Sequence, residues 1–99
     1  MPLLEISVVP VGTSTPSFSS HVSSAVDLIQ HQGLQYQVTP TATVVEGSLD
    51  QLMQLAKDIH QNALQHGANR VITHMSIDDR TDKPLVMSQQ IDAVQQSLQ

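Results

Sequence analysis

The sequence predicts an α+β domain built from two strand–helix–strand halves, and three observations lead to this prediction. Short runs rich in β-branched residues alternate with two longer segments whose apolar residues recur every three to four positions. A glycine follows each of the longer segments, at Gly33 and Gly67. The chain has 99 residues, a usual size for one hydrophobic core. We therefore expect residues 1–99 to form a single domain.

The first half of the pattern begins with a strand over residues 3–11. Leu4 and Ile6 alternate there with polar neighbours, which predicts a strand with one wet side. The helical stripe that follows consists of Phe18, Val22, Ala25, Val26 and Ile29. Gly33, followed by apolar Leu34, is typical of a left-handed cap at a helix C-terminus.

A short strand over residues 36–39 ends the first half, and another over residues 42–46 begins the second; the two should pair as an antiparallel hairpin. Ser48 and Gln51 have the spacing of a capping box, which predicts a helix that ends at Gly67. A fourth strand then places Val71, Thr73, Met75 and Ile77 on one face, and Ile72, His74, Ser76 and Asp78 on the other.

This order of elements is the ferredoxin-like βαββαβ arrangement, with a four-stranded antiparallel sheet and two helices on one face. We also expect a short C-terminal helix within residues 85–99. The opposite face of the sheet then has no helix to cover it, so function should be sought there. The residues expected on this open face are Glu5, Ser7, Gln37, Thr39, Thr43 or Glu46, His74 and Ser76.

The composition limits the partners of the protein. Only 13% of the residues are charged, the formal net charge is -5 at pH 7, and the chain has one Tyr, one Phe and no Trp. Nucleic-acid binding needs basic charge for phosphates and usually aromatic side chains for bases, so we expect no nucleic-acid partner. The chain has no Cys and no apolar run of about 18 residues. We expect a cytoplasmic protein with no membrane partner.

The histidines do not have the spacing of a metal site, because no two of the five are four residues apart. His31 and His66 fall in the last turns of the predicted helices, where a cationic side chain suits the carbonyl end of the helix dipole. We expect His60 to face solvent and His74 to point to the open face. No metal site is predicted.

No catalytic constellation is evident either. The sequence has no GxSxG motif, and the loop at Gly12 has no Lys or Arg to hold a phosphate. We therefore predict no catalytic residues, no cofactor and no enzymatic activity. The charged turn over residues 78–83 has two interpretations: a self-paired, solvated loop, or a contact at a subunit boundary in which Arg80 forms a two-pronged bond with a carboxylate.

Several segments together resemble the small thiamine-binding protein family. They include Thr43-Val44-Val45-Glu46-Gly47, Arg70-Val71 and the turn Asp78-Asp79-Arg80-Thr81-Asp82. The resemblance implies a homo-oligomer, a tetramer built from two dimers, with a ligand site near subunit boundaries. The polar positions that it implies are Ser19, Thr43, Glu46, Arg70, Asp78, Asp79 and Arg80. Two positions depart from the family: His21 stands where Tyr is common, and Ala42 where Gly is usual.

The working hypothesis is non-catalytic binding of thiamine or its hydroxymethylpyrimidine moiety, as a carrier or sensor. Such a ligand carries a cationic thiazolium or an aminopyrimidine, whose edges carboxylates and hydroxyls can satisfy. The predicted ligand-binding residues are Ser7, Ser19, His21, Thr43, Glu46 and His74. Two alternatives stay open: an oligomerisation module with a structural or regulatory role and no ligand, and a small cofactor-free enzyme with His74 or His21 as base.

Overall fold

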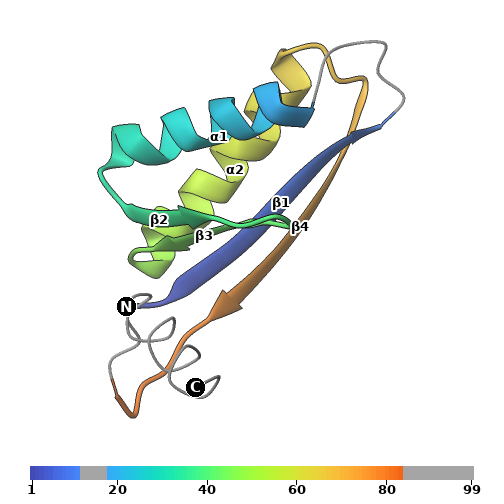
Figure 1. Ribbon diagram of the computed structural model, residues 1–99. Helices are drawn as coiled ribbons and strands as arrows, with labels where there is room; N and C mark the ends of the chain where they lie inside the picture. Colours follow the sequence, from blue (N-terminus) through green and yellow to red (C-terminus); the bar gives the residue numbers. More distant parts are fainter. Residues whose placement is uncertain (12–17, 84–99) are drawn as a thin grey trace, which may run out of the picture.

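The computed structural model describes residues 1–11 and 18–83, and for residues 18–21 it describes the backbone alone. The elements are β1 (Leu3–Val11), α1 (Phe18–Gln32), β2 (Gln35–Val38), β3 (Thr43–Glu46), α2 (Leu49–Gln65) and β4 (Arg70–Asp78). The strands form one antiparallel sheet in the order β2-β3-β1-β4, and both helices lie on one side of it (Figure 1). The predicted ferredoxin-like α+β fold is confirmed. The C-terminal helix predicted within residues 85–99 lies outside the described part of the chain.

The two sides of the sheet follow from the register of β1. Leu4 lies opposite Val45 of β3 and Ile77 of β4, and all three alternate with residues on the open face. Beyond Ile6, β1 pairs with β4 alone as far as Val11. The long β1–β4 pair therefore extends past the shorter β2 and β3, as Figure 1 shows.

The hydrophobic core lies between the helices and the sheet. Its fully buried side chains are Leu4, Ile29, Val45, Leu52 and Leu55. They come from two strands and both helices. Burying a side chain of this kind stabilises a fold by about 1.5–3 kcal/mol relative to leaving it exposed, so this one layer of contacts carries most of the stability.

The predicted start of α2 and the predicted C-terminal ends of both helices are confirmed. At the start of α2, the amide of Gln51 donates to Ser48 Oγ at 3.2 Å, and the amide of Ser48 donates to Gln51 Oε1 at 3.0 Å, which completes the capping box. Gly33 and Gly67 have φ values of 70° and 99°, in the left-handed region that favours glycine.

The two predicted helix-terminal histidines occupy their expected places. His31 Nδ1 lies 3.1 Å from the carbonyl oxygen of Asp27, and His66 Nδ1 lies 2.7 Å from that of Asn62. Each ring nitrogen lies within hydrogen-bond distance of the carbonyl four residues earlier in the chain, and the Asn62 carbonyl also accepts the backbone amide of His66 at 3.1 Å. These two side chains therefore fold back onto the C-terminal turns of their helices.

Two predictions about individual residues are wrong. His60 does not simply face solvent: it is half-buried, and its Nδ1 lies 2.6 Å from Thr73 Oγ1 on the helix side of β4. Thr39 does not lie on the open face of a strand, because β2 ends at Val38. Its hydroxyl donates to the carbonyl of Ala42 at 2.7 Å and accepts from the Ala42 amide at 3.1 Å, which closes the β2–β3 loop.

Candidate functional site

A depression on the open face of the sheet gathers polar side chains from β1 and β4. Glu5 lies directly opposite Ser76, and Ser7 lies opposite His74. Because partners in adjacent antiparallel strands have Cβ atoms about 4.5–5.5 Å apart, these four side chains form one cluster. The depression has a volume of about 260 Å³, and its remaining lining comes from Thr41, Ala42 and Met75.

The chemistry of this open-face depression is that of a hydrogen-bonding site with one carboxylate. Among the described residues, no hydrogen bond joins the side chains of Glu5, Ser7, His74 or Ser76 to another group of the protein. Their carboxylate, imidazole and hydroxyl groups are thus available to a ligand. A carboxylate with neutral donors and acceptors favours a cation or an amino-substituted ring over an anion.

Glu46 lies on the same face but outside the lining of the depression. It is half-buried at the end of β3, opposite Leu3 of β1 and Gln35 of β2. Of the two residues of β3 considered for the open face, Glu46 is therefore the one found there. Its carboxylate adds negative charge to this side of the sheet.

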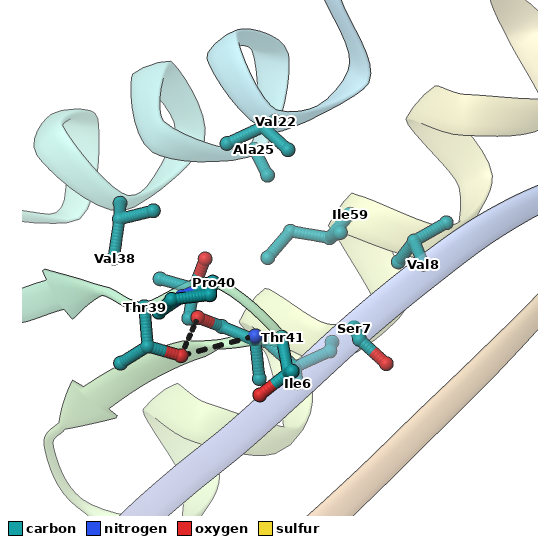
Figure 2. Close-up of a pocket in the computed structure, with 12 residues that line it drawn as sticks. Ile6, Ser7, Val8, Val22, Ala25, Val38, Thr39, Pro40, Thr41 and Ile59 are labelled. Atoms are coloured by element: carbon teal, nitrogen blue, oxygen red, sulfur yellow. Dashed lines mark hydrogen bonds between the residues drawn. The ribbon is translucent and has the colours of Figure 1, made fainter. Parts of the chain in front are cut away.

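A second, smaller cavity lies on the other side of the sheet, beneath α1. Its volume is about 50 Å³, and most of its walls are apolar. Figure 2 shows Val22 and Ala25 of α1 and Ile59 of α2 projecting toward the β2–β3 loop, while the Ser7 hydroxyl points away. We call this space the helix-side cavity. It has room for a few water molecules.

Thr43 faces this helix-side cavity, because it lies opposite Ile6 of β1 and Val38 of β2. Only 7% of the residue is exposed. Its hydroxyl has no hydrogen-bond partner within the described chain. Every fully enclosed side-chain oxygen or nitrogen of the described residues does have a partner, so the Thr43 hydroxyl is not fully enclosed. The Thr43 hydroxyl consequently keeps its access to the cavity.

The structure thus separates the residues predicted to bind a ligand. Ser7 and His74 meet in the open-face depression, Glu46 lies nearby on the same face, and Thr43 lies on the opposite side. The remaining two, Ser19 and His21, belong to the first turn of α1, and their side chains lie outside the described part of the structure.

Glu5 and Ser76 line the depression but were predicted only as residues of the open face. The spacing of Glu5 and Ser7, two apart on the wet side of a strand, was the available signal. The part played by Ser76 depends on the register between β1 and β4, which the alternation of residues within one strand does not reveal.

The charged turn after β4 pairs with itself. Arg80 Nε donates to Asp82 Oδ1 at 2.9 Å, and Arg80 Nη2 donates to Asp82 Oδ2 at 2.6 Å. These bonds lower the pKa of the Asp82 carboxyl and raise the pKa of the Arg80 guanidinium, which the charge of Asp78 raises further. The two-pronged bond forms inside the turn, as the self-paired interpretation expects.

Within residues 1–11 and 18–83, no three His, Cys, Asp or Glu side chains come together in a way that could hold a metal ion. None of the helices in these segments has the length and apolar character needed to cross a membrane.

A match to a protein family spans nearly the whole chain. Residues 4–95 match the family described as thiamine-binding protein. A similar curated protein is YqgV of Bacillus subtilis, named only as a UPF0045 protein. It is 36% identical over 103 residues, which cover 100% of this chain and 99% of that one.

Solved structures with the same fold extend the comparison. A hypothetical protein from Methanocaldococcus jannaschii has a TM-score of 0.85 and 28% identity, with 95% of each chain covered. A candidate thiamine biosynthesis or salvage protein from Thermotoga maritima has a TM-score of 0.78 and 22% identity, covering 94% of this chain and 97% of that one. At that identity the second likeness supports the fold alone.

Proposed function

Because this chain belongs to the thiamine-binding protein family, we propose that it binds thiamine or its hydroxymethylpyrimidine moiety without catalysing a reaction. It would act in the cytoplasm as a carrier or sensor. The observation that carries the proposal is the open-face depression, where Glu5, Ser7, His74 and Ser76 converge with unpaired polar groups. The binding site lies there.

Each side chain of the depression has a role that suits this ligand. The Glu5 carboxylate accepts from the exocyclic amino group of the pyrimidine or lies beside the thiazolium charge. Ser7, Ser76 and His74 offer donors and acceptors to the ring nitrogens and the hydroxymethyl group. Glu46, on the same face, adds to the negative potential that attracts a cation.

The size of the depression supports a site that a second subunit completes. Ligand pockets usually enclose about 300–1,000 Å³, and the depression offers about 260 Å³ on an exposed sheet face. One subunit can therefore seat a single ring, and a neighbouring copy would cover the rest. This agrees with the proposed homotetramer of two dimers, with the ligand near a subunit boundary.

Three of the predicted ligand-binding residues define a second candidate site. Thr43 lines the helix-side cavity, and Ser19 and His21 belong to α1, on the helix side of the sheet. The cavity's 50 Å³ is far below the usual size of a ligand pocket, so α1 or the β2–β3 loop would have to move before a pyrimidine could enter. For this reason we favour the open face.

Titration calorimetry with thiamine and with hydroxymethylpyrimidine tests the proposal. We expect heat of binding for the natural chain and an affinity about 10- to 100-fold lower for Glu5→Gln, because a charge-assisted hydrogen bond contributes about 1.5–3 kcal/mol. Asp27→Asn is the matched control, since it removes the same charge from an exposed position of α1. No heat with either compound at millimolar concentration would refute ligand binding.

Two further variants locate the site. If the open face binds the ligand, His74→Gln lowers the affinity and Thr43→Val leaves it unchanged. If Thr43→Val lowers the affinity and His74→Gln leaves it unchanged, the ligand binds in the helix-side cavity instead. If neither compound binds while the chain still forms oligomers, the oligomerisation module without ligand becomes the better account.

A further inference from the structure

The β2–β3 loop, residues 39–42, forms part of the wall of both cavities. Thr41 and Ala42 line the open-face depression, and they also line the helix-side cavity. Ser7 of β1 is the third residue common to the two linings. The two cavities therefore lie on opposite sides of one short piece of chain, and a movement of this loop changes the shape of both.

Strand pairing stops where the loop begins. The last pair between β1 and β3 joins Ile6 to Thr43, and β1 then continues to Val11 with β4 alone among the described strands. Hydrogen bonds between neighbouring strands fix the position of a segment in a sheet. The loop lies beside Ser7, beyond the last of these bonds on this side of β1.

One residue holds the loop in its position. The Thr39 hydroxyl donates to the Ala42 carbonyl at 2.7 Å and accepts from the Ala42 amide at 3.1 Å (Figure 2). The Thr39 amide donates to the same carbonyl at 2.8 Å. Within the described chain, no hydrogen bond joins Pro40 or Thr41 to another residue, and both are exposed. The place of Thr41 beside the depression therefore depends on the bonds of Thr39.

The helix-side cavity gives the loop room to move. The cavity has a volume of about 50 Å³, and Val22, Ala25 and Ile59 bound it across from the loop (Figure 2). Protein interiors are usually packed too closely for a segment to shift without cost. Here the space lies directly beside the loop. Pro40 and Ala42 are apolar, so they can enter it without burying a polar side chain.

We propose that the β2–β3 loop has two positions and couples the two sides of the sheet. In the latched position, which the Thr39 side chain holds, Thr41 and Ala42 complete the wall of the open-face depression. In the released position these side-chain bonds are broken, the loop folds into the helix-side cavity, and the depression loses that wall.

A ligand in the depression contacts the loop only in the latched position, so its binding favours that position. The side chains of α1 that bound the helix-side cavity then report on a ligand that they do not touch. This effect of a ligand rests on the proposed function. The movement itself rests on the contacts of the loop and does not need a ligand.

Methyl relaxation dispersion on the ligand-free full chain measures the movement, because loop motions of this kind take microseconds to milliseconds. We expect one common exchange process at methyl groups on both sides of the cavity, since a single movement changes their surroundings together. These methyl groups are those of Val22, Ala25, Thr41 and Ala42. The Ala63 methyl, buried on α2 and outside both linings, should show no exchange.

Two substitutions shift the balance in opposite directions. Thr39→Val keeps the shape of the side chain but removes its two hydrogen bonds, so it should raise the population of the released position about tenfold. Thr39→Ser keeps the hydroxyl and is the matched control. Ala25→Val adds two methyl groups inside the cavity, so the double variant Thr39→Val/Ala25→Val should return to the natural level of exchange. Ser23→Val, at an exposed position of α1, is the control for the second change.

Two results would overturn the two-position loop. One is the absence of exchange at Thr41 and Ala42 in Thr39→Val. The other is a double variant Thr39→Val/Ala25→Val that exchanges as much as Thr39→Val alone, because a filled cavity leaves the loop no place to enter.

A thiamine titration followed by the same measurement separates the coupling from the ligand. At saturation, thiamine should quench the exchange of the Val22 and Ala25 methyl groups on the other side of the sheet. Binding in calorimetry with undiminished exchange would contradict the coupling alone. Exchange that responds to Thr39→Val in a chain that binds neither thiamine nor hydroxymethylpyrimidine would contradict the ligand alone.

Discussion

The two faces of the sheet hold different kinds of residue although they belong to the same strands. Leu4 and Val45 are fully buried beneath the helices, while Glu5 and Glu46, their neighbours along the chain, lie on the open face. Residues that stabilise the fold therefore alternate along each strand with residues that are available for binding. Substitutions on the covered face should change the free energy of unfolding, and those on the open face should change binding or assembly.

The largest expected effect concerns the helix layer that covers the sheet. Leu52 of α2 is 0% exposed, so Leu52→Ala should lower the free energy of unfolding by about 2–5 kcal/mol through lost burial and a cavity. Met53→Ala is the control one residue away, because Met53 is 50% exposed and should cost far less. Urea denaturation measures both. Equal losses of unfolding free energy in the two variants would contradict the placement of Leu52 on the covered face.

A smaller change in the free energy of unfolding is expected when substitutions on the two faces of β4 are compared. Thr73→Val keeps the shape of the side chain but removes the partner of His60, and leaving a half-buried nitrogen unpaired should cost about 1–2 kcal/mol of unfolding free energy. Ser76→Ala, three residues along on the open face, should stay within about 0.5 kcal/mol. Urea denaturation measures the free energy of unfolding of both variants. If Ser76→Ala proved the costlier change, the two faces would not differ as described.

The smallest effect is expected in the turn after β4. The pKa of Asp82 lies below its ordinary value because of its bond to Arg80, so the pair can favour the folded state only while Asp82 is ionised. That contribution is lost as the pH falls through the lowered pKa. Because both side chains are exposed, solvent screens the pair, and Arg80→Gln should leave the urea midpoint unchanged.

The same variant should still raise the pKa of Asp82 toward its ordinary value, which NMR titration of the carboxyl carbon measures. Arg70→Gln, which removes a positive charge far from the turn, should leave that pKa where it is. An Asp82 pKa that stayed low in Arg80→Gln would show that the hydrogen bonds from Arg80 are not its main cause.

Most of the fold could be predicted because its signals are local. Alternation of apolar residues identified the strands, and Ser48 with Gln51 marked the start of α2. The error at His60 has a physical cause: the periodicity of a helix does not show how near its flank comes to the next layer. Thr39 was misplaced because its hydroxyl closes the β2–β3 loop, and a strand pattern cannot show which residue will do so.

The candidate site was less predictable because it depends on how strands lie beside one another. Ser7 and His74 could each be placed on the open face from alternation alone. Their meeting in one depression follows from the register of β1 against β4, and its rim comes from Thr41 in the β2–β3 loop. Thr43 lies on the other side of the sheet because its strand places it opposite Ile6.

The most direct test of ligand binding on the open face is a thiamine titration followed through the backbone amide signals of the uniformly ¹⁵N-labelled chain. We expect the shifted signals to cluster at Glu5, Ser7, His74 and Ser76, while those of Val22 and Ala25 beside the helix-side cavity stay in place. Shifts confined to Val22, Ala25 and Thr43, or no shift at millimolar thiamine, would contradict it.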